Sequence, residues 1–177
     1  MIYHEKDMEE RAVLDAAMKM CAAARTAPKT AGIDHIATMV LTGAEKDELA
    51  DRLDKMGEEQ SIAFYRRDAG NLRKAQAVVL IGVKEGTRGL DKGCRYCRFS
   101  GCVGCSEAGG VCIFDPLDLG IAIGSAVSLA ADLRIDNRVM YSAGKAALDL
   151  KIMGEEVSII MAIPLSALGK SPFFDRK

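Results

Sequence analysis

The chain has 177 residues, 49% of them hydrophobic and 28% charged, so it can bury a sizeable core as one domain over 1–177. A formal net charge of −1, no tryptophan and 5% aromatic residues argue against nucleic acid or an anionic membrane as partner. No apolar run reaches the ~20 residues of a membrane span, and the first residues lack signal-peptide character, so we expect a cytoplasmic protein.

The first quarter of the chain predicts one long helix, a loop and a strand. Apolar residues recur at helical spacing over 7–27, and Pro28 ends the pattern because the residue before a proline leaves the helical region. Residues 29–34 form the loop. The short apolar run 35–41 then predicts a buried strand.

Two further helices and a second strand follow. Thr42 and Glu45 have the spacing of a capping box, which predicts the start of a helix that ends near Gly57. A third helix is expected over 62–74. The continuous apolar run 77–83 is typical of a strand buried on both faces.

A helix rich in small residues is expected over 115–133. Asp115 fits the N-cap and Pro116 the first helical position. The glycines, alanines and serines of this helix allow close packing at a core or at an interface between two copies of the chain.

The last third of the chain predicts a turn at 136–137, a short helix over 142–150 and a strand over 157–163 that Pro164 ends. Helices and strands thus alternate without internal repeats. This order is typical of an α+β or α/β class.

Five of the six cysteines fall in one glycine-rich segment between the strand 77–83 and the small-residue helix. They are Cys94, Cys97, Cys102, Cys105 and Cys112. Thiolates this close together predict a metal site. Structural zinc knuckles are usually separated by roughly 12 to 20 residues, whereas only four separate these two Cys-x2-Cys pairs.

The spacing therefore favours an iron–sulfur cluster, most simply of the 4Fe–4S type, with zinc and redox-active thiols as alternatives. Disulfides would need an oxidising compartment. Cys94, Cys97 and Cys102 would supply three ligands, and spacing alone favours Cys105 as the fourth. Cys21 lies on the first helix and is interpreted as a small core residue.

No catalytic residue can be named from the sequence. His4 lies near the N-terminus and His35 begins a strand, and neither has an aspartate or cysteine at a motif spacing. The sequence shows no nucleophile and general base at a known motif spacing, so the catalytic residues stay unknown.

Several segments resemble known families. Residues 22–28, at the end of the first helix, are similar to the flavin loop of nitroreductases, and the order of elements resembles that fold. The segments 118–126, 136–141 and 172–176, with the cysteine run, resemble a prokaryotic family described as ferredoxin-domain proteins.

The nitroreductase resemblance implies a two-layer α+β fold, with a mixed sheet flanked by helices and a cysteine-rich insertion at about 84–114. It implies a homodimer with flavin mononucleotide (FMN) at the subunit interface. The arginine- and serine-bearing phosphate segment ahead of the first helix is missing, since residues 1–10 offer only Lys6. The candidate substitutes are Arg25, Lys29, Thr30, Gly32 and Arg176.

The family resemblance favours Cys112, rather than Cys105, as the fourth metal ligand. Together these features predict a redox or electron-transfer protein that carries an iron–sulfur cluster, uses FMN if its site is retained, and exchanges electrons with a partner protein. The alternative is a non-catalytic metal-binding sensor or partner module that has lost flavin.

Overall fold

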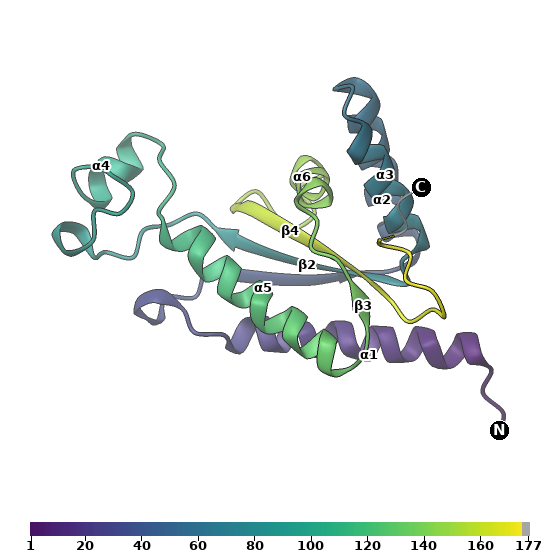
Figure 1. Cartoon of the computed structure of the whole chain (residues 1–177). Helices are drawn as coiled ribbons and strands as arrows, with labels where there is room; N and C mark the ends of the chain where they lie inside the picture. The colour runs from purple at the N-terminus through teal and green to yellow at the C-terminus, as the bar shows by residue number, and fades with distance from the viewer. Residues whose placement is uncertain (175–177) are drawn as a thin grey trace.

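The computed structural model describes residues 1–174, which form one antiparallel sheet with helices on both faces (Figure 1). The helices over this range are α1 (Glu5–Thr26), α2 (Gly43–Glu59), α3 (Ala63–Lys74), α4 (Cys102–Glu107), α5 (Phe114–Asp132) and α6 (Tyr141–Asp149). The strands are β1 (Ile36–Leu41), β2 (Ala77–Lys84), β3 (Asp136–Asn137) and β4 (Val157–Ser166), in the order β1-β2-β4-β3. The 3₁₀ turns are η1 (Thr30–Gly32) and η2 (Asp91–Gly93).

The central strand β2 divides the interior into two cores. Val78 and Leu80 point to the face covered by α2, α3 and α6, whereas Val79 and Ile81 point to the face covered by α1 and α5. Side chains alternate along a strand, so a continuous apolar run can serve both faces. The predicted doubly buried strand is confirmed, because all of β2 except Lys84 is buried.

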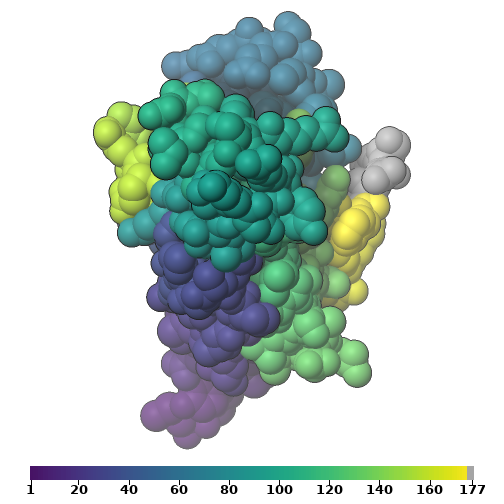
Figure 2. Space-filling model, turned by 90° about the vertical axis from the view of Figure 1, so that its left-hand side faces the viewer, coloured from purple at the N-terminus to yellow at the C-terminus, as the bar shows by residue number. Residues whose placement is uncertain are grey.

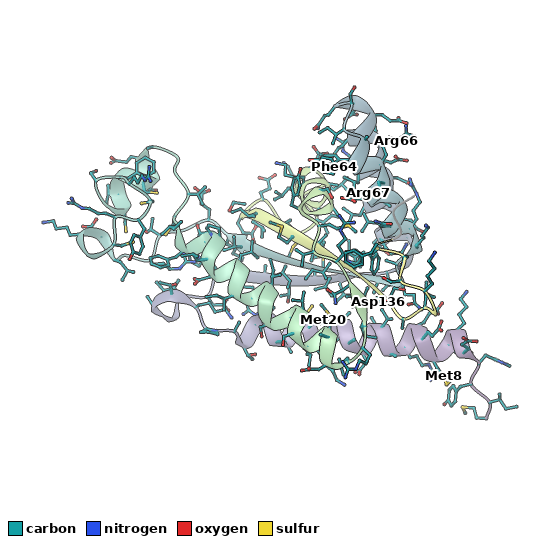
Figure 3. All side chains as sticks on the ribbon, viewed as in Figure 1. Met8, Met20, Phe64, Arg66, Arg67 and Asp136 are labelled. Atoms are coloured by element: carbon teal, nitrogen blue, oxygen red, sulfur yellow. The ribbon has the colours of Figure 1, made fainter. Side chains whose placement is uncertain are left out.

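Helices α1 and α5 lie side by side below the sheet in Figure 1. Met20, labelled in Figure 3, is fully buried in this layer with Ala122 and Ala126. Among the described residues, α5 alone has the length and apolar composition of a membrane span, with a mean hydropathy of 1.3. Its inner face belongs to the core, as expected of the central helix of a globular domain.

The α+β class is confirmed, but two details differ from the expectation. Every strand pairing within residues 1–174 is antiparallel, where a mixed sheet was expected. Helices also pack on both faces, so the fold has a helical layer on each side of the sheet instead of two layers in all. Both differences depend on how distant segments meet, which local patterns do not specify.

Two predictions for the last third of the chain are wrong. β4 continues past Pro164 to Ser166, and residues 136–137 form the short strand β3 instead of a turn. Ala162 directs both its N–H and its C=O to Met140. Because backbone groups alternate along a strand, the nitrogen of Pro164 faces the same edge of β4 as the N–H of Ala162. The described pairing of β3 with that edge begins only at Leu165, so the N–H that proline lacks breaks no pairing there.

Two helix starts also differ from the capping signals. Thr42 precedes α2, but its side chain makes no capping hydrogen bond. Helix α5 begins at Phe114, so Asp115 lies inside the first turn and not at the N-cap. The Asp115 carboxylate is fully buried, and its partners come from another part of the chain.

The cysteine segment stands clear of the sheet. It leaves the end of β2, carries η2 and α4, and returns at α5, and Figure 1 shows it projecting from one end of the molecule. Figure 2 views that end directly, with the loop that follows α1 lying just below the cysteine segment. Two parts of the chain with predicted cofactor roles are thus neighbours.

Candidate metal centre

All five clustered cysteines line one pocket in the projecting segment. Its wall includes Cys94, Cys97, Cys102, Cys105 and Cys112, together with Arg88, Leu90, Asp91 and Phe114. Cys105 and Cys112 are buried and the other three are half-buried. The structure therefore brings together every cysteine that the sequence singled out, while Cys21 lies apart on α1, half-buried beside the core.

A tight local arrangement holds Cys102. The amide of Asp91 donates to Cys102 Sγ at 3.3 Å, and the amide of Cys102 donates to Asp91 Oδ1 at 3.0 Å. Gly101 makes this possible: its φ is +151°, and a Cβ there would lie 2.1 Å from Asp91 Oδ1. Backbone N–H donation to a cysteine sulfur is one means by which proteins tune iron–sulfur centres.

Cys105 is a buried member of the thiol group. Burial raises the pKa of its thiol, and a hydrogen bond with Cys97 and the neighbouring Cys112 and Cys102 raise it further. An apolar, thiol-crowded setting of this kind favours the protonated thiol of Cys105 in the metal-free protein. Metal binding would therefore release protons.

The donor set fits a thiolate-bound centre, whereas the space is small. The cavity enclosed by the pocket is about 20 Å³, enough for about one water molecule. Over residues 1–174, no three His, Cys, Asp or Glu side chains converge as ligands of one metal ion. A cluster would therefore need the thiols to move apart, and the projecting segment, with its six-residue α4, lies outside the packed core.

A buried ionic group joins the two ends of the cysteine segment; we call Arg88, Asp115, Asp118 and His35 the ionic neck. Arg88 precedes the cysteines and the two aspartates follow them on α5. Its guanidinium lies 2.8 Å from Asp115 Oδ1 and 3.0 Å from Asp118 Oδ2, and all three side chains are at most 1% exposed. Arg88 also lines the thiol pocket, so the ionic neck forms the floor of that pocket.

The neck reaches the loop that follows α1. The backbone N–H and the hydroxyl of Thr30 both donate to Asp118, the hydroxyl at 2.8 Å. Asp118 thus joins this loop to Arg88 and to the base of the thiol pocket. This arrangement explains why the two segments lie together in Figure 2.

His35 is the functional candidate that the sequence did not reveal. Its Nδ1 lies 2.8 Å from Arg88 Nη1 and 3.6 Å from Asp115 Oδ1. A Cβ on Gly86 would lie 2.3 Å from its Cε1, so the glycine admits the ring. These partners are 53 and 80 residues away along the chain, and no motif spacing could have signalled them.

The proposed flavin contacts are largely engaged within the chain. Arg25 donates to the carbonyl of Ile36 and pairs with Asp34. The ammonium of Lys29 donates to carbonyls of the last turn of α1 and to the carbonyl of Ala27 just after it, which is a common way to cap a helix C-terminus. Gly32 is exposed with a φ of +68°, and Arg176 lies outside the described residues.

Comparison with known proteins gives two kinds of likeness. Residues 108–176 match the model of a family described as uncharacterized protein containing a ferredoxin domain. An uncharacterized protein of Archaeoglobus fulgidus is 42% identical over 99% of this chain and 98% of its own length. That alignment spans the cysteine segment, which the family model covers only in part.

Solved structures are similar in fold. The FMN-dependent nitroreductase NfnB of Mycobacterium smegmatis, in complex with NADPH, matches with a TM-score of 0.63 and 11% identity, over 90% of this chain and 81% of that one. The nitroreductase CinD of Lactococcus lactis, in complex with nicotinic acid, has a TM-score of 0.61 and 13% identity, over 96% and 81%. The fold is therefore nitroreductase-like.

Proposed function

We propose a redox function for this chain, which belongs to the family described as uncharacterized proteins containing a ferredoxin domain. In this proposal the projecting segment holds an iron–sulfur cluster of the 4Fe–4S type, and the protein passes electrons between that cluster and a partner protein. The family description and the nitroreductase-like fold both support redox chemistry.

The observation that carries the proposal is the gathering of five thiols around one pocket. A bound cluster would supply one-electron transfer. The chain's own residues would hold and tune it: four of the thiolates as ligands, the Asp91 amide as a donor to Cys102, and Arg88 as a buried positive charge at the base. Thiols that must stay reduced favour the cytoplasm as the location.

The proposal is tested by purifying the protein without oxygen and measuring iron, acid-labile sulfide and visible absorbance. We expect about four irons and four sulfides per chain, with broad brown absorbance that bleaches on reduction. A colourless protein that holds one zinc ion per chain under the same conditions would contradict the proposal.

We expect FMN to bind weakly. The cations nearest the nitroreductase-like flavin loop, Arg25 and Lys29, are engaged by acceptors of the chain itself, so a phosphate would have to displace those contacts. Titration followed by quenching of flavin fluorescence should not saturate below about 100 µM, equivalent to less than about 5.5 kcal/mol of binding free energy. Saturation at low micromolar FMN would contradict this expectation.

The same engagement of Arg25 and Lys29 favours a second candidate function. A metal-binding sensor or partner module would keep the scaffold and the cysteine segment without flavin chemistry. The response of the visible absorbance to added reductant separates this candidate from electron transfer, because a structural module would bind metal whose oxidation state does not change with added reductant.

We propose that the protein is a homodimer through the outer face of α1 and α5. Leu14, Met18, Leu117 and Ile121 are all at least 42% exposed on these adjacent helices. Exposed apolar patches of this kind commonly mark interfaces. Sedimentation at micromolar concentration should give twice the 19.0 kDa chain mass.

Ile121→Glu should shift this dimer to the monomer, because it places a charge in an apolar interface. Leu168→Glu, at an equally exposed leucine after β4, should leave the mass unchanged. A wild-type chain that sediments as a monomer would end the dimer proposal.

A further inference from the structure

The outer turn of the cysteine segment carries positive charge that the chain does not neutralise; we call residues 90–98 the basic turn. Lys92, Arg95 and Arg98 are all exposed, and none of these side chains forms an ion pair or a hydrogen bond within the described part of the chain. The one acid of the turn is Asp91, whose Oδ1 already accepts a backbone amide at 3.0 Å. Three cations and one carboxylate give the turn a formal charge of +2 (3 − 1), in a chain whose net charge is −1.

Several exposed cations elsewhere in the fold are balanced by acids of the chain itself. The ammonium of Lys19 lies 2.6 Å from Asp15, and that of Lys151 lies 2.6 Å from Glu155. The cations of the basic turn have no such acids and lie within seven residues of one another. Like charges this close repel, so an acidic group from outside the chain would relieve the repulsion.

Apolar side chains are exposed on the same turn. Tyr96 is 72% exposed and Leu90 is 43% exposed. Two tight backbone turns keep these residues together, because the amide of Gly93 donates to the carbonyl of Leu90 and the amide of Arg98 donates to that of Arg95. Exposed tyrosine and arginine are the residues that protein–protein interfaces favour. A single exposed aromatic residue offers little for stacking the bases of a nucleic acid.

Two arginines hold the turn's backbone in a strained conformation. The φ angle is +51° at Arg95 and +66° at Arg98, in the left-handed region that residues other than glycine and asparagine rarely adopt. Strain of this kind clusters at functional sites. Glycine or asparagine would fit both positions better, so the backbone does not account for the arginines, whereas a role of their exposed side chains does.

We propose that the basic turn docks an acidic surface of a partner protein. Leu90 and Arg95 also line the thiol pocket, so the partner would lie beside the cysteines. The segment projects from one end of the molecule and is open to solvent there (Figures 1 and 2). The proposal rests on the proposed function for the role of the partner, whose surface it describes, but the contact itself needs no bound metal. Unpaired charges of one sign steer an oppositely charged partner, and salt weakens that attraction.

The first test measures binding of a fluorescent, glutamate-rich peptide that also carries leucines, by fluorescence anisotropy with the anaerobically purified protein. The dissociation constant should rise about tenfold or more between about 20 mM and about 200 mM salt, because salt screens exposed charges. The same peptide with glutamine in place of glutamate should not bind. Absence of binding by the glutamate peptide, or binding that salt leaves unchanged, overturns the proposal.

A triple variant locates the charge that binds the peptide. Lys92→Gln, Arg95→Asn and Arg98→Asn together should weaken binding about tenfold or more, and asparagine suits the positive φ at both arginine positions. The matched control removes the same total charge from three exposed lysines on α2, α3 and α6 and should bind like the wild type; its changes are Lys55→Gln, Lys74→Gln and Lys145→Gln. Equal weakening in the two triple variants means that overall charge attracts the peptide, and it overturns the proposal.

The second test uses the iron-free protein, so it separates failure of this proposal from failure of the proposed function. Backbone amide signals are followed by NMR while the glutamate peptide is added. The largest shifts should fall within residues 90–98, and shifts confined to other elements overturn the proposal. A single-stranded oligonucleotide of the same length that binds more tightly than the peptide would identify a nucleic acid surface and also overturn it. Peptide binding at the basic turn by a protein that never holds iron would support the docking surface and contradict only the iron–sulfur function.

Discussion

Replacing Cys97 with serine should reduce bound iron from about four atoms per chain to less than one. Cys97 lines the pocket and lies within hydrogen-bonding reach of Cys105, so its loss removes one of the proposed ligands. Serine keeps the size of the side chain but is a poor ligand for iron. Cys94→Ser and Cys102→Ser should have the same effect, measured as iron and sulfide in anaerobically prepared protein.

The remaining two cysteines decide the fourth ligand. One of Cys105→Ser and Cys112→Ser should lose iron as Cys97→Ser does, and the other should keep most of it. Cys21→Ser is the matched control, because this thiol lies on α1 outside the pocket, and it should bind iron like the wild type. Full iron content in all five pocket variants would refute the site.

Replacing Arg88 with methionine should lower the free energy of unfolding by about 3–5 kcal/mol. Methionine keeps much of the apolar volume but leaves Asp115 and Asp118 as two buried carboxylates without a cation. Urea denaturation of the iron-free protein measures the loss without any effect of metal. The two ends of the cysteine segment would also separate, so iron retention should fall in the same variant.

Arg73→Met is the control for this prediction. Arg73 also contacts two aspartates, Asp51 and Asp54, but its side chain is 42% exposed on α3. Solvent screens such pairs, and we expect a loss of no more than about 1 kcal/mol. A loss equal to that of Arg88→Met would show that the burial of the ionic neck does not determine how much it contributes to the free energy of unfolding.

The sequence by itself determined the elements and the cysteine site. Helical periodicity places α1, α2 and α3 within a few residues of their observed bounds, because a helix or strand is largely set by neighbours a few residues away. The dense Cys-x2-Cys spacing likewise identified the thiol pocket, since the five cysteines that line it lie on one short segment.

The tertiary structure alone decided how these parts combine. The antiparallel sheet order, the extension of β4 past Pro164 and the burial of Asp115 all depend on segments that meet only in the folded chain. The ionic neck is the clearest case. His35, Arg88 and Asp118 come from three separate segments, up to 83 positions apart, counting 118 − 35. A local sequence pattern cannot predict such contacts. The charges of the ionic neck meet only because α5 and the loop after α1 pack together at the end of the sheet.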